Sequence, residues 1–154
     1  MMQEDVLITA QENKTDYTAL REATDHIKQE LRQLNVGQEQ LIETLLVALL
    51  ADGHVLIEGV PGIAKTLTAK LLARTVQVDF SRIQFTPDLM PSDVLGTSVF
   101  HPGTATFDYK KGPVFANLVL IDEINRAPAK TQASLFEVME EQHITHDGQV
   151  YPLQ

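Results

Sequence analysis

The N-terminal part of the chain alternates apolar and polar residues with the period of amphipathic helices. Between residues 17 and 34, and again between 38 and 51, apolar side chains recur at steps of three and four, which places them on one helix face. Asn35-Val36-Gly37 interrupts the pattern, and Asp52-Gly53 ends it, because glycine adopts the left-handed conformation after a helix at little cost. Residues 1–16 show no such period, so we expect a mobile tail there. The inward-facing residues expected from the pattern are Leu20, Ala23, Ile27, Leu31 and Leu34, then Leu41, Ile42, Leu45, Leu46, Leu49 and Leu50.

Segments that predict strands then follow at residues 54–58, 80–85 and 118–121. The first and last lack polar alternation, which is typical of strands that are covered on both faces in a parallel sheet. Helical spacing returns at residues 65–76 and 129–141. The inward residues expected in these two helices are Leu67, Leu71 and Leu72, then Leu135, Val138 and Met139.

Turn-forming residues separate the remaining segments. Residues 86–96 predict an ordered loop with one helical turn, and residues 97–109 a hairpin around Pro102-Gly103. Residues 143–151 predict a second hairpin, because Asp147-Gly148 favours a type I′ turn. The order of the elements predicts an α/β fold, with a parallel sheet core, N-terminal helices and small β-hairpin insertions, in one domain over residues 17–154. The last residues predict no closing helix or strand, so we expect a partial fold that is incomplete at its C-terminal end.

Composition narrows the class of protein. The chain of 154 residues is 44% hydrophobic, has a net charge of −9 and contains no cysteine. A disulfide framework and a thiolate metal site are therefore excluded, and a reducing compartment is indicated. The negative charge argues against a nucleic-acid partner and against an anionic membrane surface, since both are bound through basic patches. No signal peptide or membrane span is recognisable, so we expect a cytoplasmic protein.

A glycine-containing loop lies between the predicted strand 54–58 and the helix after it. Gly59 and Gly62 allow the backbone to curl so that N–H groups point at phosphate oxygens, and the helix start adds its positive dipole end. The ammonium of Lys65 would bridge the β- and γ-phosphates, and the Thr66 hydroxyl would bind Mg²⁺. Ala64 departs from the general phosphate-loop pattern, which has glycine there. The loop consists of Gly59, Val60, Pro61, Gly62, Ile63, Ala64, Lys65 and Thr66, and Leu67 follows it.

Two carboxylates end the predicted strand 118–121. Acids at the carboxyl end of a parallel strand face the ligand crevice, so this strand is expected beside that of the phosphate loop. Asp122 would hold Mg²⁺, mostly through water, and Glu123 would orient and deprotonate the attacking water. Two exposed acids at a strand end are common on their own, but here the phosphate loop gives them a role. No Asn-Lys-x-Asp segment for reading guanine is present, so ATP is the expected nucleotide.

Four separated segments resemble the MoxR family of AAA+ ATPases, a P-loop NTPase group with a three-layer fold. They are the run from His54 to Thr66, Gln84 to Asp93, Gly112 to Asn117, and Asp122 to Pro128. The family commonly has alanine where Ala64 stands, so the departure noted above supports the resemblance.

The resemblance implies an ATP–Mg²⁺-dependent ATPase that assembles into a ring, usually a hexamer, and acts as a chaperone-like remodeller on a protein client. A partner with a von Willebrand A domain is a further implication. Val36 and Gly37 match the region near the adenine. Arg126 would face the neighbouring subunit, and Gln84 would hold Glu123 in an inactive pose. The family continues into a sensor strand, an arginine finger and a helical lid, so we expect the chain to be truncated before them and weak in hydrolysis.

Two other functions stay open at this stage. One is a nucleotide-binding interaction module without turnover, and the other is a DNA-processing motor, which the acidic charge disfavours. His143 and His146 are expected on opposite strand faces, which argues against joint metal binding. Phe107 and Tyr109 are expected to pack within their hairpin rather than line a pore.

Overall fold

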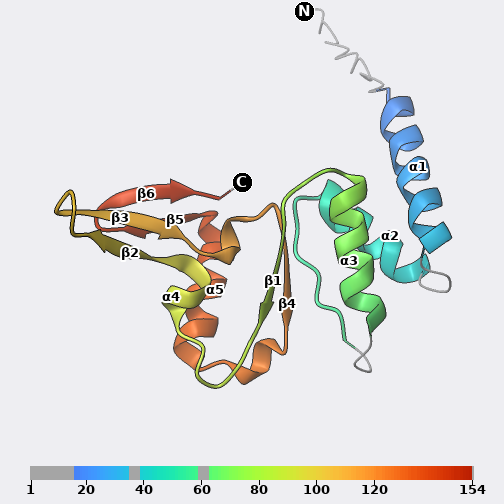
Figure 1. Ribbon diagram of the computed structural model, residues 1–154. Helices are drawn as coiled ribbons and strands as arrows, with labels where there is room; N and C mark the ends of the chain where they lie inside the picture. Colours follow the sequence, from blue (N-terminus) through green and yellow to red (C-terminus); the bar gives the residue numbers. More distant parts are fainter. Residues whose placement is uncertain (1–15, 35–38, 59–62, 154) are drawn as a thin grey trace, which may run out of the picture.

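The computed structural model describes residues 16–34, 39–58 and 63–153 of the chain, with side chains described for all of these except residues 33, 34, 63 and 64 (Figure 1). Three predictions therefore lie outside the described residues. They concern the tail over residues 1–15, the region near the adenine at Val36 and Gly37, and the glycine loop over Gly59, Val60, Pro61 and Gly62.

Three helices form one side of the molecule. They are α1 (Thr18–Leu34), α2 (Glu39–Leu50) and α3 (Ile63–Thr75). Leu31, Ile42, Leu46 and Leu72 are buried where the three helices meet. The predicted helices are confirmed, and only the faces that they bury differ from the expectation.

Several residues predicted to face inward are exposed. Leu20, Leu49, Leu50 and Leu67 have exposed fractions of 45%, 42%, 54% and 40%. Figure 1 shows the reason for α1, whose first turns extend past the ends of α2 and α3. In α3 the side chains that are almost fully buried are mostly small, with Thr68, Ala69 and Ala73 accompanying Leu72. Helical period fixes which residues share a face, whereas the neighbouring helices decide which face is covered.

The residue with left-handed backbone after α2 is Asp52, one position before the Gly53 that the sequence predicted. Asp52 has φ 49°, whereas Gly53 is not among the residues with positive φ. Gly53 N–H donates to Ala48 O at 2.9 Å and closes the last turn. Aspartate is one of the few side chains that tolerate this conformation, so the sequence placed the turn correctly but assigned it to the wrong residue.

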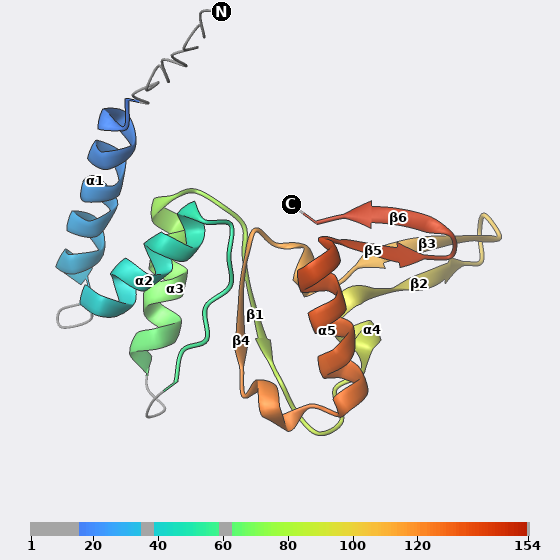
Figure 2. The ribbon, with the colours of Figure 1, turned by 180° about the vertical axis from the view of Figure 1, so that it is seen from behind.

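A parallel pair of strands divides the molecule. β1 (Phe80–Gln84) and β4 (Leu118–Asp122) pair in register, with Gln84 opposite Asp122. α3 lies on one side of this pair, and α5 (Ala129–Glu141) lies on the other, as the two opposite views show (Figures 1 and 2). The layered α/β arrangement with a parallel pair at its centre confirms the predicted fold class.

The predicted strand over residues 54–58 is wrong. The segment is extended but is not assigned to any sheet among the described residues, and β4 pairs with β1 instead. Leu56 is 77% exposed, so the segment is not covered on both faces. Apolar and β-branched residues form a strand only where a neighbouring strand completes the ladder of hydrogen bonds. The sequence pattern does not show whether such a strand is present.

A third unit extends from the parallel pair. It contains the short helix α4 (Pro91–Leu95), a hairpin of β2 (Gly96–His101) and β3 (Thr106–Lys111), and a hairpin of β5 (His143–His146) and β6 (Gln149–Pro152). Two 3₁₀ turns, η1 (Pro113–Phe115) and η2 (Ile124–Arg126), flank β4.

Both hairpins and the helical turn were predicted and are confirmed. Asp147 and Gly148 have φ 49° and 75°, as a type I′ turn requires. The core of this unit consists of Ile83, Phe85, Val94, Val114, Phe115, Ala127, Leu135, Val138 and Ile144.

Candidate functional site

The start of α3 and the carboxyl ends of β1 and β4 lie at the same end of the molecule (Figures 1 and 2). Lys65 and Thr66 belong to the first turn of α3, and both are half-buried. The first N–H groups of a helix have no partner within the helix, and its dipole is positive at this end. The helix start that carries a lysine and a threonine therefore lies at the same end of the molecule as the strand end that carries the two acids (Figures 1 and 2).

Asp122 is the last residue of β4 and is paired with an arginine from the neighbouring strand. Arg82 Nε and Arg82 Nη2 each lie 2.6 Å from Asp122 Oδ2. The Asp122 side chain is 26% exposed and that of Arg82 is 50% exposed. Arg82 Nη2 also donates to Gln84 Oε1 at 3.4 Å. Gln84 is thus connected to Asp122 through Arg82, whereas the sequence had placed it against Glu123.

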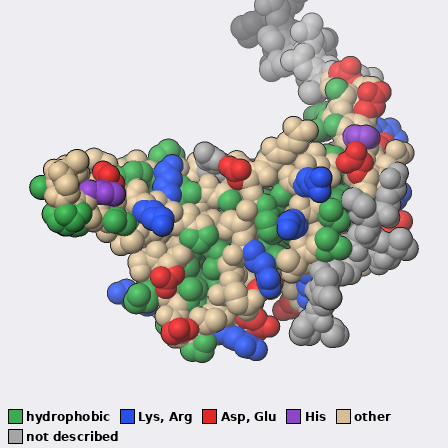
Figure 3. Space-filling model, in the orientation of Figure 1, with side chains coloured by type: hydrophobic (Ala, Val, Ile, Leu, Met, Phe, Trp, Pro, Cys, Tyr) green, Lys and Arg blue, Asp and Glu red, His purple; other side chains and the backbone are tan. Residues whose placement is uncertain are grey.

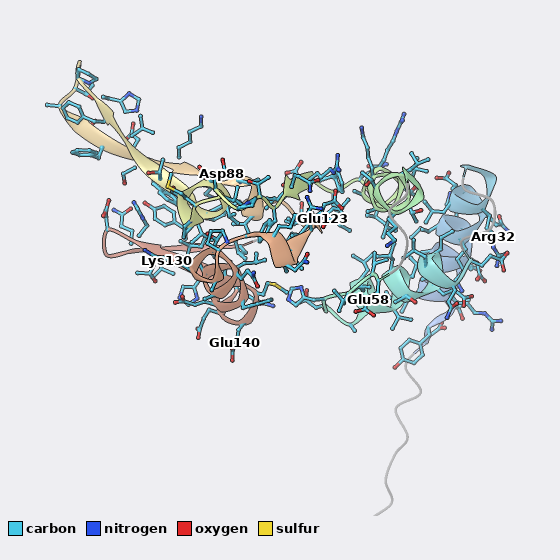
Figure 4. All side chains as sticks on the ribbon, turned by 90° about the horizontal axis from the view of Figure 1, so that it is seen from below. Arg32, Glu58, Asp88, Glu123, Lys130 and Glu140 are labelled. Atoms are coloured by element: carbon cyan, nitrogen blue, oxygen red, sulfur yellow. The ribbon has the colours of Figure 1, made fainter. Side chains whose placement is uncertain are left out.

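Glu123 follows directly and turns away from the strand. Its backbone is left-handed, with φ 57° and ψ 42°, which is uncommon for a residue other than glycine and is often found at functional sites. Arg126 Nε lies 3.1 Å from Glu123 Oε2. Arg126 N–H also donates to Glu123 O at 2.8 Å, which closes the 3₁₀ turn η2. Figure 4 shows Glu123 in the middle of the molecule, between α5 with Lys130 and α1 with Arg32.

The residues fit a magnesium ion bound together with a nucleotide. The Thr66 hydroxyl and the Asp122 carboxylate are hard oxygen ligands, which Mg²⁺ prefers. Among the described residues, no group of three or more histidine, cysteine, aspartate or glutamate side chains could form a metal cage. Mg²⁺ does not require one, because it keeps several waters and takes oxygens from phosphates.

Sequence reasoning missed Arg82. Its side chain lies on the same strand face as Gln84, because residues two apart in a strand point the same way. The register opposes Gln84 to Asp122, which brings the arginine to the carboxylate. The sequence shows that residues 82 and 84 share a strand face, but it does not show that this strand pairs with the one that carries Asp122.

His143 and His146 contact different partners and not each other. His146 Nε2 lies 2.8 Å from Ser98 Oγ, and the same hydroxyl donates to Asp147 Oδ2 at 2.8 Å. Because the single hydroxyl proton goes to the carboxylate, His146 Nε2–H is the donor to Ser98 Oγ. This arrangement joins the two hairpins and does not activate the serine. His143 Nδ1 instead contacts Glu141 O at 2.8 Å.

The two aromatic residues of the hairpin differ in their surroundings. Tyr109 is half-buried and packs against Phe115 and Tyr151, which lie outside its own hairpin. Phe107 is 68% exposed and contacts Phe100, with ring centroids 5.0 Å apart. Figure 3 shows hydrophobic side chains gathered at the far end of the arm that β2 and β3 form. Within the described residues, no helix is long and apolar enough to cross a membrane.

Residues 54–154 match the protein family described as "ATPase family associated with various cellular activities (AAA)". The chain is 55% identical over 124 residues to Chaperone MoxR1 of Mycobacterium tuberculosis, an alignment that covers 80% of this chain and 33% of that protein. It is 48% identical over 134 residues to the YeaC protein of Bacillus subtilis, with 87% and 41% covered. It is 30% identical over 140 residues to Protein MoxR of Methylorubrum extorquens, with 87% and 40% covered.

A solved structure supports the same relationship. The crystal structure of a provisionally assigned ATPase from Cytophaga hutchinsonii superposes with a TM-score of 0.74 at 44% identity, over 88% of this chain and 43% of that one. The alignments therefore cover between 33% and 43% of the length of these relatives. Since the family match covers most of the chain and relatives named MoxR align along it, the chain belongs to the AAA ATPases, in their MoxR group.

Proposed function

We propose that this chain binds ATP together with Mg²⁺ and carries the core of a MoxR-type ATPase site. The supporting observation is that the start of α3 and the carboxyl end of β4 lie at the same end of the molecule (Figure 1). The start of α3 carries Lys65 and Thr66, and the end of β4 carries Asp122, with Glu123 directly after it. Cationic and helix-start groups on one side and acids on the other are what a triphosphate with a divalent ion requires.

Each of the four residues has a separate task. Lys65 contacts the β- and γ-phosphates, and Thr66 and Asp122 provide oxygen ligands for Mg²⁺. Mg²⁺ supplies charge neutralisation of the phosphates when it is bound. Glu123 accepts a proton from the water that attacks the γ-phosphate, which is the role of a general base.

A nucleotide-binding module without turnover is the second candidate. It is favoured by the ion pair between Glu123 and Arg126, because a carboxylate oxygen that contacts a guanidinium at 3.1 Å is directed at the arginine and not at a water. The two functions share nucleotide binding and differ only in hydrolysis.

Titration calorimetry with ATP and MgCl₂ tests the shared step. The Lys65→Ala variant should bind ATP about 10- to 100-fold more weakly, which corresponds to a lost hydrogen bond to a charged group. Lys70→Ala is a matched control, because Lys70 lies in the same helix with an exposed side chain. Unchanged affinity in Lys65→Ala would overturn the assignment. Phosphate release by the parent chain then separates turnover from binding alone.

The role of the whole protein is part of the same proposal. The name of the mycobacterial relative, a chaperone, supports a protein client and a chaperone-like action. We further propose assembly into a ring of the size usual for the group, a hexamer, a partner with a von Willebrand A domain and a cytoplasmic location. Light scattering with and without ATP and MgCl₂ measures the assembly.

A further inference from the structure

The strand register places four side chains on one face of the parallel pair. Arg82 lies opposite Leu120 and Gln84 lies opposite Asp122. Because side chains two residues apart share a face, Arg82 and Asp122 are diagonal neighbours across the two strands. This placement depends on the backbone ladder and not on the flexibility of the arginine.

The contact between them is short and concentrated on one atom. Both Arg82 Nε and Arg82 Nη2 approach Asp122 Oδ2 at 2.6 Å. Hydrogen bonds between ionised partners are the strongest kind, and a planar guanidinium fixes its direction as well. The Gln84 side chain accepts a further hydrogen bond from Arg82 Nη2 at 3.4 Å.

We propose that Arg82 is the internal counter-ion of Asp122 and competes with Mg²⁺ for this carboxylate, so that the metal side of the site is closed until ATP and Mg²⁺ arrive together. The inference rests on the proposed function, since it requires Asp122 to be the magnesium ligand. It assigns a role to Arg82, a positioning residue that acts through Asp122.

The sign of the effect follows from charge. A guanidinium on Asp122 Oδ2 neutralises the acid and occupies one of its oxygens. Removal of this cation leaves the carboxylate available and also removes a positive charge close to a dication. The Mg²⁺-dependent part of nucleotide binding should therefore become stronger in an Arg82 variant. A merely structural role predicts the opposite, because a loosened strand pair would weaken binding.

The size of the effect is limited by exposure. Half of the Arg82 side chain is in contact with solvent, and exposed ion pairs contribute little net free energy. We expect the ratio of the ATP dissociation constant in EDTA to that in MgCl₂ to rise by about 1.5- to 5-fold in Arg82→Gln.

Four chains provide the comparison. Arg82→Gln keeps much of the length of the side chain and removes its charge, and Arg82→Lys keeps the charge but not the fork. Lys28→Gln is the control, because it also removes the cation of an ion pair, the one between Lys28 Nζ and Glu43 Oε1 at 3.2 Å, which joins α1 to α2 and involves none of the proposed ligand residues. Asp122→Asn removes the proposed ligand itself. Far-UV circular dichroism and thermal unfolding establish that each variant folds.

The expected pattern is a raised ratio in Arg82→Gln, a smaller rise in Arg82→Lys and no change in Lys28→Gln. An unchanged or lowered ratio in folded Arg82→Gln would overturn the role of Arg82. If ATP binding by the parent chain does not depend on MgCl₂, or if Asp122→Asn keeps the parent's ratio, the magnesium assignment of the proposed function fails instead, and the inference falls with it.

A measurement on the unaltered chain does not depend on any variant folding. The ¹⁵N signal of Arg82 Nε–H, assigned by its loss in Arg82→Lys, should be protected from exchange with water in EDTA. Addition of ATP and MgCl₂ should remove this protection, whereas ATP with EDTA should not. Protection that persists with both ATP and MgCl₂ would show that Arg82 stays on Asp122, which contradicts the competition.

Discussion

Arg126 Nε lies 3.1 Å from Glu123 Oε2, so the second acid of the site is held by an arginine only three residues further along the chain. The left-handed backbone of Glu123 begins the turn that brings the two side chains together. Such a backbone costs about 1 kcal/mol or more in a residue with a Cβ atom, and it persists only where the surroundings enforce it. Here the short turn η2 between β4 and α5 does so.

Glu123→Gln tests the role of this acid. The amide keeps the shape of the side chain but cannot accept a proton, so ATP binding should be retained, and phosphate release should fall by about 10²- to 10⁴-fold. Calorimetry measures the first and a phosphate-release assay the second. Turnover at the parent rate in Glu123→Gln would exclude Glu123 as the base.

Tyr109→Phe should destabilise the arm. The Tyr109 hydroxyl donates to Leu95 O at 2.7 Å from a half-buried position, and loss of one such bond costs about 0.5–1.5 kcal/mol of unfolding free energy. Urea unfolding measures the change. Tyr17→Phe is the control, because Tyr17 is 65% exposed, and it should unfold as the parent does.

The same tyrosine predicts a pH dependence. Burial, with a smaller contribution from Tyr151, raises the pKa of Tyr109 above its ordinary 10.0. A raised pKa in the folded state means that the neutral form is favoured there, so this contribution to stability is complete below pH 10 and is lost as the pH rises through the folded pKa. The parent chain should therefore lose stability above pH 10 by an amount that Tyr109→Phe does not show. Equal alkaline slopes in the two chains would contradict this account.

Gly96→Ala should destabilise the chain by at least about 2 kcal/mol, because it adds a strained backbone to a steric clash. Gly96 has φ 115°, and a Cβ atom there would lie 2.3 Å from Lys110 O. Gly103→Ala provides the contrast, since Gly103 has no atom within 4 Å of its ideal Cβ position. Thermal unfolding should separate the two variants, and equal midpoints would refute the importance of the close approach.

Thr131→Val should weaken the attachment of the loop before α4 to α5. Thr131 is 1% exposed, and its Oγ1 donates to Leu89 O at 2.7 Å. Replacement of the hydroxyl by a methyl group leaves that carbonyl without its donor, which costs about 1–3 kcal/mol. Thr44→Val is the control, because the Thr44 hydroxyl donates to Gln40 O at 2.8 Å from an exposed position on α2. A similar loss of stability in both variants would show that helix propensity, and not the buried bond, decides the result.

The local sequence pattern was sufficient to predict the elements that depend mainly on neighbouring residues in the chain. α5 begins and ends as predicted, and the Asp147-Gly148 turn follows from two residues with a known preference. The segment 54–58 could not be settled in this way, because a strand exists only with a partner, and partners are distant in sequence.

The site was predicted in its chemistry but not in its contacts. Lys65, Thr66, Asp122 and Glu123 were singled out by residue type and spacing, because phosphate and metal chemistry restricts both, and their roles stay predictions. The pairing of Asp122 with Arg82 could not be recognised, since it depends on the register of two strands. The residues whose placement carries the phosphate loop itself, Gly59–Gly62, lie outside the described part, so that half of the site stays a prediction.

The carbonyl of Leu95 accepts two hydrogen bonds, one from the Tyr109 hydroxyl at 2.7 Å and one from Gly112 N–H at 2.9 Å. Leu95 ends α4, and Gly96 begins β2 with no connecting residue between them. The base of the hairpin is thereby held to the short helix by two hydrogen bonds and by the chain itself. A displacement of the hairpin that keeps these contacts therefore has to move α4 with it.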